Sequence, residues 1–364
     1  MGKQLSLNLD LSPVCPFRDF LDEDDCHCLG LGAQSGGYDF LDENDKRLGQ
    51  WLADVRGVGL NNVIAQPSRL PGLPIYIPGI TRGSYNVMRE IYKKRSIPIV
   101  AVTLGSILNM SKDKISVLPN VRESLGLEEG TKLVLLCYGR DYLIERIWPV
   151  RHEIYRQIKK SGFDLVTGIN YSIWLDQPHA ERLINLKRNL ITFSEMQDYG
   201  LTAIPHIYWY GQRDIERISE WINQNPINMI ALNLQTLGGE AIWKKNLTEL
   251  RTFYQKLSKP VHFLITGPTT LDRIEDLKLV LPSLSLTNSA LLKAVKHETP
   301  IRISEKACRM VKTKEDPAVT FLEITDFYTV VLLEKEIKGA GYMRVALKSS
   351  SRLNKTLLSG KVGQ

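Results

Sequence analysis

The 364-residue sequence contains no apolar run long enough to cross a membrane. A membrane-spanning helix needs about 20 predominantly apolar residues, and polar or charged residues interrupt every apolar stretch of this chain earlier than that. The first residues also lack the basic segment followed by an apolar core that marks a secretion signal. We therefore expect a cytoplasmic protein with no membrane partner.

Several motifs that would identify a reaction are also missing. The chain has no Gly-Lys-Ser/Thr phosphate loop, no three-cysteine loop of radical enzymes and no His-Glu-x-x-His zinc-protease helix. Cys15, Cys26, His27 and Cys28 are nevertheless the residue types that bind zinc. The Cys-His-Cys spacing is tighter than the usual cysteine pairs, so two interpretations stay open: a zinc site at these four residues, or reduced thiols of a cytoplasmic protein.

Charge is segregated along the chain. Residues 1–60 contain eleven Asp or Glu and five Lys or Arg, and residues 335–364 contain seven Lys or Arg and one Glu, within a net charge of +7. We interpret residues 1–60 as an acidic, cysteine-containing appended segment, and residues 300–364 as a C-terminal extension with a basic tail. Such a tail can contact the phosphates of DNA or RNA, although terminal basic tails are often only solvated.

Between residues 97 and 299, short apolar strands alternate with amphipathic helices. This alternation predicts an α/β fold with a parallel sheet, closed most economically into a TIM-barrel-like (β/α) barrel. The eighth strand would come from residues 63–65 or from beyond residue 300, because four prolines in the connector at 61–96 disfavour a central strand. The predicted strands cover residues 97–104, 132–138, 163–168, 202–209, 229–234, 261–266 and 283–287.

Helical periodicity separates these strands. Residues 141–160 predict a helix that Pro149 kinks or splits. A longer one is predicted at 178–199, with Lys187 and Arg188 facing solvent. Beyond residue 300 the apolar runs 319–324 and 328–333 predict a hairpin or small sheet, which makes the C-terminal extension β-rich. Further helices are predicted at 214–223, 240–257 and 271–279.

Polar residues follow the predicted strands where a barrel places its site. Asn170 and Ser172 come just after one strand and can hydrogen-bond the oxygen or amide of a ligand. Asp176, in the same loop, is a candidate base, nucleophile or metal ligand. Its alternative role is to cap the helix that follows Pro178.

Asn233 and Gln235 end another strand and share one face of it. Their amides suit a sugar or a base edge, and the alternative is a network that only satisfies loop backbone. Thr266 ends the next strand. The backbone amides at the start of the helix that follows it can donate hydrogen bonds to a phosphate. A simple helix cap by Thr269 or Thr270 explains that loop equally well.

The segment Ile204-Pro-His-Ile-Tyr-Trp209 brings three ring side chains to one strand end. His206 is a candidate proton carrier, and Tyr208 and Trp209 form an aromatic platform for a ring substrate. The alternative for His206 is a satisfied core residue. Arg140 and Asp141, after the second strand, offer an anion-binding and a catalytic side chain, or else a surface ion pair.

Five short motifs between residues 168 and 236 carry a family resemblance. They are Gly168-Ile-Asn-Tyr-Ser172, Asp176-Gln-Pro178, Ile184-Asn-Leu-Lys-Arg188, Ile204-Pro-His-Ile-Tyr-Trp209 and Asn233-Leu-Gln-Thr236, with Leu70-Pro-Gly-Leu-Pro74 as an extension. With them the chain resembles an uncharacterised family of bacteria, archaea, phages and mobile elements, known only as a domain of unknown function. The resemblance implies a mobile-element or phage-related locus and brings no activity.

A more distant, fold-level similarity is to tRNA-guanine transglycosylases. These are barrel enzymes that exchange a base with carboxylates at strand ends and carry a cysteine-rich zinc site. The chain lacks that family's cysteine spacing and a clear second carboxylate. We expect an enzyme acting on a base, nucleoside or glycosidic bond, as a hydrolase or transglycosylase. The alternatives are a non-catalytic nucleic-acid-associated protein of mobile-element maintenance or defence, and a barrel that binds a small ligand.

Overall fold

The computed structural model describes residues 34–35, 38–39, 46–111, 114–174, 177–235, 237–288, 301–304, 307–310 and 316–333. Asp176 lies outside these ranges, as do the predicted zinc ligands Cys15, Cys26, His27 and Cys28. The basic tail also lies outside them, so its contact with DNA or RNA stays a prediction.

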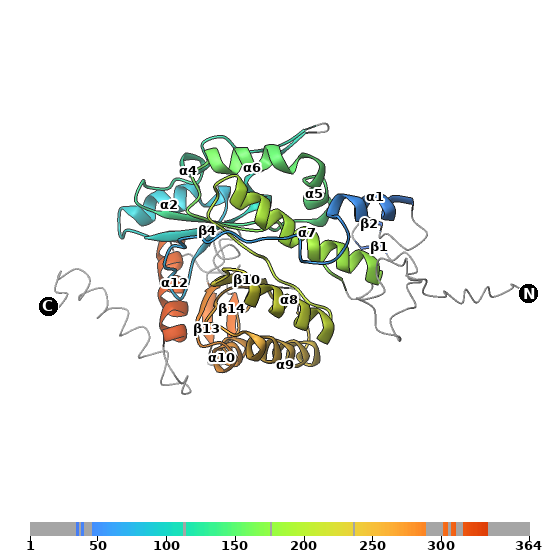
Figure 1. The fold of residues 1–364 in the computed structure, drawn as a ribbon. Coiled ribbons are helices and arrows are strands. Elements are labelled where there is room, and N and C mark those ends of the chain that lie inside the picture. The colour runs from blue at the N-terminus through green and yellow to red at the C-terminus, as the bar shows by residue number, and fades with distance from the viewer. Residues whose placement is uncertain are drawn as a thin grey trace, which may run out of the picture.

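Two parallel sheets form the centre of the molecule (Figure 1). Strands that follow one another in the chain are neighbours in each sheet, as repeated strand-helix units require. The α/β class is therefore confirmed. One sheet contains β3 (Gly79–Ile80), β4 (Ile99–Thr103), β7 (Lys132–Leu136), β8 (Leu165–Thr167) and β9 (Ala203–Ile204); the other contains β10 (Met229–Asn233), β11 (His262–Thr266) and β12 (Leu284–Thr287).

Single parallel bridges link the outer strands of the two sheets. Tyr76 pairs with Leu286, before β3 and within β12, and the Leu286 amide donates to the Ile75 carbonyl at 2.7 Å. On the other side His206, just beyond β9, pairs with Ala231 of β10. Backbone hydrogen bonds thus continue from each edge of the five-stranded sheet to an edge of the three-stranded sheet.

Helices connect the strands, and the bounds of α7, α8, α9 and α10 lie within two residues of the predicted ones. Pro149 splits the predicted helix at 141–160, as expected, into α5, a 3-10 turn at Trp148–Val150, and α6. Among the described residues, no helix is long and apolar enough to cross a membrane. The helices are α1 (Lys46–Val55), α2 (Tyr85–Tyr92), α3 (Leu104–Ile107), α4 (Val121–Ser124), α5 (Asp141–Glu145), α6 (Arg151–Lys160), α7 (His179–Asp198), α8 (Gln212–Gln224), α9 (Glu240–Lys256), α10 (Leu271–Val280) and α12 (Pro317–Leu333), with a 3-10 turn at Arg82–Ser84.

Three antiparallel pairs lie outside the parallel sheets. β1 (Gln34–Ser35) pairs with β2 (Tyr38–Asp39), and β5 (Leu108–Met110) pairs with β6 (Ile115–Val117). β13 (Ile301–Ser304) pairs with β14 (Ala307–Met310) in the predicted C-terminal extension. That extension therefore contains a hairpin, at an earlier position than the sequence analysis placed it.

The apolar runs 319–324 and 328–333 form the helix α12, and the prediction of a hairpin there was wrong. Buried residues Ala318, Phe321, Ile324 and Tyr328 recur at helical spacing. The Tyr328 ring stacks on Tyr76 with centroids 4.9 Å apart. Packing of this face overrides the strand preference of the β-branched residues in the run.

The remaining parallel strand comes from the proline-rich connector, which the sequence analysis had excluded in favour of residues 63–65 or beyond 300. That interpretation was wrong because proline lacks only the N–H donor and keeps its carbonyl acceptor. The Pro78 carbonyl accepts the Ala101 amide at 2.9 Å, and the Pro74 carbonyl accepts the Ser285 hydroxyl at 2.6 Å. Pro78 thus occupies a ladder position where only an acceptor is needed.

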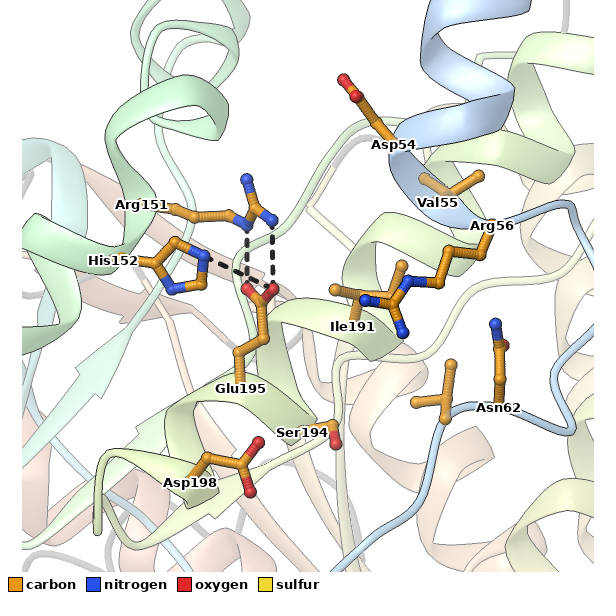
Figure 2. Close-up of a pocket in the computed structure, with 11 residues that line it drawn as sticks. Asp54, Val55, Arg56, Asn62, Arg151, His152, Ile191, Ser194, Glu195 and Asp198 are labelled. Atoms are coloured by element: carbon orange, nitrogen blue, oxygen red, sulfur yellow. Dashed lines mark hydrogen bonds and ion pairs between the residues drawn. The ribbon is translucent and has the colours of Figure 1, made fainter.

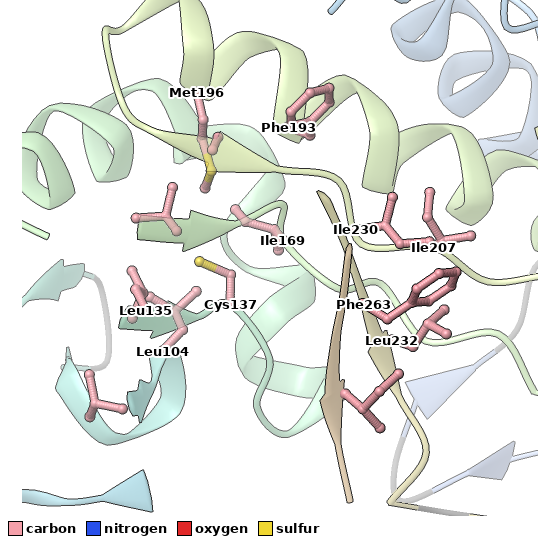
Figure 3. Close-up of a cluster of buried hydrophobic side chains, with 14 of the residues drawn as sticks. Leu104, Leu135, Cys137, Ile169, Phe193, Met196, Ile207, Ile230, Leu232 and Phe263 are labelled. Atoms are coloured by element: carbon pink, nitrogen blue, oxygen red, sulfur yellow. The ribbon is translucent and has the colours of Figure 1, made fainter. Parts of the chain in front are cut away.

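Two sets of buried apolar side chains occupy the two faces of the parallel strands. Along β4, Ile99 and Ala101 belong to the smaller set, whereas Val100 and Val102 belong to the larger one that packs against the helices. Figure 3 shows part of the larger set, where Phe193 and Met196 of α7 approach the strands. The smaller set comprises Ile77, Ile99, Ala101, Val134, Leu136, Leu165, Ile204, Met229, Ala231 and Leu264, with Leu70 and Leu73 of the connector packed against it.

Candidate functional site at the strand ends

Five polar or aromatic residues lie together at or just past the carboxyl ends of the parallel strands. We refer to Tyr138, Asn170, His206, Tyr208 and Thr266 as the strand-end cluster. Tyr138, Asn170 and the pair His206 and Tyr208 follow β7, β8 and β9, and Thr266 is the last residue of β11. Because the strands are parallel, their carboxyl ends share one side of the sheets. Three of the five were predicted as ligand-binding residues and His206 as a catalytic one; Tyr138 was not predicted.

Direct contacts join the members of this cluster. The Asn170 side-chain amide donates to the Tyr208 hydroxyl at 3.1 Å. The His206 and Tyr208 rings stack with centroids 5.3 Å apart and 19° between their planes. Thr266 lies near the Tyr138 hydroxyl and partly opposes the effect of burial on its pKa. This stacking places the His206 and Tyr208 rings on the same side of their segment.

Burial keeps the cluster uncharged. It raises the pKa of the Tyr138 and Tyr208 hydroxyls well above the ordinary value, and it lowers the pKa of His206 to about 3. A proton carrier works best with a pKa near the working pH. His206 is therefore a neutral hydrogen-bonding ring at neutral pH, which differs from the proton-carrying role that the sequence analysis considered.

Three buried polar atoms of the cluster have no hydrogen-bond partner within the described part of the chain. They are the side-chain oxygen of Asn170 and both ring nitrogens of His206. A buried polar atom without a partner costs about 1 to 3 kcal/mol, and such atoms are rare in folded proteins. These atoms are thus available to a ligand with both donors and acceptors.

Asp141 brings a carboxylate next to the cluster. It is the first residue of α5, and its two oxygens accept the Ser172 hydroxyl at 2.7 Å and the Trp174 indole N–H at 3.2 Å. The negative charge of Asp141 contributes to the raised pKa of Tyr208. Two predicted residues, Asp141 and Ser172, are thereby in direct contact.

Buried amides of α7 hold the loop that carries Asn170 and Ser172. The Asn189 side chain accepts the Tyr171 amide at 2.6 Å and donates to the Tyr171 carbonyl at 3.2 Å. The Asn185 amide donates to the Ser172 carbonyl at 3.0 Å. Neither asparagine was predicted as a site residue, although their spacing of four residues on one helix face was a readable signal.

Lys187 and Arg188 are buried, so the expectation that they face solvent was wrong. The Lys187 ammonium donates to the Gly59 carbonyl at 2.5 Å, because the segment after α1 covers this side of α7. The Arg188 guanidinium pairs with Glu145 at 2.8 Å and lies 3.6 Å from the Tyr171 ring centroid. Each cation thus binds a segment that is distant in sequence from α7, and helical periodicity alone does not predict such a contact.

Trp209 lies apart from the strand-end cluster. Its ring stacks on Phe253 of α9 with centroids 5.0 Å apart, and its N–H donates to Glu249 at 3.1 Å. The indole was predicted to stack on a substrate, but its contacts with Phe253 and Glu249 turn it toward the helix layer. Tyr208 is the aromatic residue of this segment that faces the cluster.

The other predicted ligand-binding residues sit at the rim of the cluster. Asn233 pairs with Thr266 in the β10–β11 register, and its side-chain oxygen accepts the Gln235 amide at 3.1 Å. Gln235 and Arg140 are both exposed. Within the described ranges no group of three or more His, Cys, Asp or Glu side chains is arranged to hold a metal.

A separate cavity of about 370 Å³ lies between the segment after α1 and helices α6 and α7 (Figure 2). Glu195 points into it and binds Arg151 through two hydrogen bonds of 2.8 and 3.1 Å, with His152 at 3.8 Å. Its carboxylate also accepts the Tyr155 hydroxyl at 3.0 Å. Because Glu195 is already satisfied by protein partners, we assign this cavity to the packing of α1 and α6 on α7.

Comparisons with known proteins do not assign this chain to a family. Neither a scan against protein-family models nor a search of curated proteins finds a match. Among solved structures the chain is similar to one described as a cube-shaped, highly porous protein cage designed by fusing symmetric oligomeric domains. That likeness has a TM-score of 0.36 and 10% identity over 80% of this chain and 78% of that chain, and it carries no argument about function.

Proposed function

We propose that the two parallel sheets form one eight-stranded TIM-barrel-like (β/α) barrel. The bridges at Tyr76 and His206 support this, because they continue the ladder at both edges of the five-stranded sheet. The smaller apolar set supports it too, since its residues come from β4, β7, β8, β9, β10 and β11 and from Ile77. Such a set is what the filled interior of a barrel contains. The strand-end cluster would then line the mouth of the barrel.

The cluster binds a neutral polar ring, such as a nucleobase, a nucleoside or a sugar. The observation that carries this proposal is the joined, uncharged set of buried Asn170, buried His206 and half-buried Tyr208. Among the described residues it has three unpaired hydrogen-bonding atoms. An amide oxygen and a neutral imidazole together offer acceptors and a donor, which match the edge of a base or the hydroxyls of a sugar. Aromatic rings add a stacking surface.

The reaction that this arrangement serves best is cleavage or exchange of a glycosidic bond. Asp141 is the carboxylate beside the ring site, and it acts as base toward a water molecule or as nucleophile. In hydrolysis the water oxygen bonds to the anomeric carbon while the bond to the leaving group breaks. Asp141 then takes the proton of the water, and the leaving group receives a proton from solvent.

A second candidate function is binding of the same ring without turnover. It is favoured by the contacts of Asp141, whose two oxygens already accept hydrogen bonds from Ser172 and Trp174. A carboxylate held in this way also suits a structural role in orienting the loop. The two candidates share the ring site and differ only in what Asp141 does.

The test measures binding and product formation with a panel of nucleobases, nucleosides and N-glycosides. For the enzyme, we expect Asp141→Asn to lower product formation by about 10²-fold or more while the affinity for the ring changes little. Asp198→Asn, at the opposite end of α7, is the matched control and should behave as the wild type. Ring binding without turnover in the wild type would leave the binding function, and absence of ring binding would refute both.

A further inference from the structure

Arg182 is a buried cation that forms no ion pair with the described residues. Its side chain lies in the first turns of α7 and is only 8% exposed. Its Nε and Nη1 atoms are buried and have no hydrogen-bond partner, and no ion pair joins it to any carboxylate of the described residues. Charged side chains are almost never fully buried unless they are paired. Arg182 therefore differs from Arg188, which is equally enclosed but is paired with Glu145.

The surroundings of Arg182 place it at the strand-end side of α7. Its guanidinium lies 3.5 Å from the ring centroid of Tyr210, which is two residues beyond Tyr208. His179, one turn earlier on the same helix face, contacts the same ring with centroids 6.5 Å apart. Because helical side chains lean toward the helix N-terminus, Arg182 points back toward the start of α7, where the loop from Asn170 ends.

The nearby acids Asp214 and Glu181 have other partners. Asp214 of α8 accepts the Tyr210 amide at 2.9 Å and Arg217 at 3.2 Å. Within the described residues no side-chain hydrogen bond caps the start of α7 at Pro178, and the buried Glu181 of its first turn accepts the Gln177 side-chain amide at 2.7 Å. Free amides and the helix dipole at such a terminus favour an anion. A nine-tenths buried guanidinium with no ion-pair partner among the described residues thus lies beside a helix start that no described side chain caps.

We propose that Arg182 and the start of α7 bind the phosphate group of a nucleotide-type ligand. A guanidinium suits a phosphate because its planar fork donates two parallel hydrogen bonds. The nucleotide form of this proposal rests on the ring site proposed above, with the ring at the strand-end cluster and the phosphate toward Arg182. The anion site itself stands on the geometry of Arg182 alone.

The experiment compares a nucleoside with its 5′-monophosphate by calorimetry, using a base that the wild type binds. We expect the monophosphate to bind roughly 10- to 100-fold more tightly, as one charge-assisted contact provides. Arg182→Gln should remove this difference and leave nucleoside affinity unchanged, which also shows that the variant is folded. Arg182→Lys should retain part of it. Arg156→Gln, at an exposed ion pair on α6, is the matched control.

Inorganic phosphate provides a separate arm that needs no ring ligand. If the wild type binds phosphate and Arg182→Gln does not, the anion site stands even where no base or nucleoside binds and the proposed function fails. If the nucleoside and its monophosphate bind equally, the anion site is overturned while the ring site stands. The anion site is also overturned if Arg182→Gln binds phosphate and the monophosphate as tightly as the wild type does.

Discussion

Replacing Asn189 by alanine should destabilise the protein and loosen the loop that carries Asn170 and Ser172. The Asn189 side chain makes two hydrogen bonds to the backbone of Tyr171, at 2.6 and 3.2 Å, in a fully enclosed position. Alanine leaves a buried N–H and a buried C=O without partners. Each such group costs about 1 to 3 kcal/mol, so we expect a loss of about 2 to 5 kcal/mol in the free energy of unfolding.

Urea denaturation followed by circular dichroism measures this loss. The midpoint should fall by roughly 1 to 2 M, because the slope with denaturant is a few kcal/mol per molar for chains of this kind. Asn246→Ala is the matched control, since Asn246 bonds the Ile242 carbonyl on an exposed face of α9 and should change stability by at most about 0.5 kcal/mol. Equal midpoints for the two variants would refute the argument that Asn189 holds the loop.

Two further predictions concern charge. Burial lowers the pKa of Lys187 from 10.5 to about 8, so the unfolded chain binds that proton more tightly than the folded one. The free energy of unfolding of the wild type should therefore rise between pH 8 and 10.5 by about 1 to 3 kcal/mol more than that of Lys187→Met. Below pH 8 the two pH profiles should run parallel. Parallel profiles above pH 8 would contradict this. The basic tail at 335–364 should bind labelled single-stranded and duplex DNA and RNA with an affinity that falls steeply as salt rises. A chain ending at residue 334 should lose that binding, and salt-independent or tail-independent binding would exclude phosphate contacts by the tail.

Much of the central fold was readable from the sequence because each strand is an apolar run that ends at a polar residue. The strand before Asn233 and the break at Pro149 appear where the local pattern predicts them. The strand beside Pro78 was missed because a proline argues against a ladder unless its carbonyl alone is used. The helix α12 was missed because its β-branched residues are packed into a helix by their neighbours.

The location of the candidate site could be predicted from the sequence, but not all of the residues that form it. Asn170, Tyr208 and Thr266 were found because they end strands, and their common side follows from parallel pairing. Tyr138 was overlooked because it was treated only as the end of a strand. The roles of His206 and Trp209 depended on burial and on the layer each ring faces, and a single sequence gives neither quantity directly. The pairing of Asn189 with Tyr171 needs the tertiary contact itself.

The contacts of Arg188 have a consequence for the order in which the molecule assembles. Its guanidinium lies near three aromatic rings from separate parts of the chain: Trp51 of α1, Trp148 between α5 and α6, and Tyr171 of the site loop. During synthesis α1 emerges well before α7, and Lys187 bonds a carbonyl 128 residues earlier. The helix made first therefore gains its docking surface only when α7 has been made, and the site loop is fixed in that same late step.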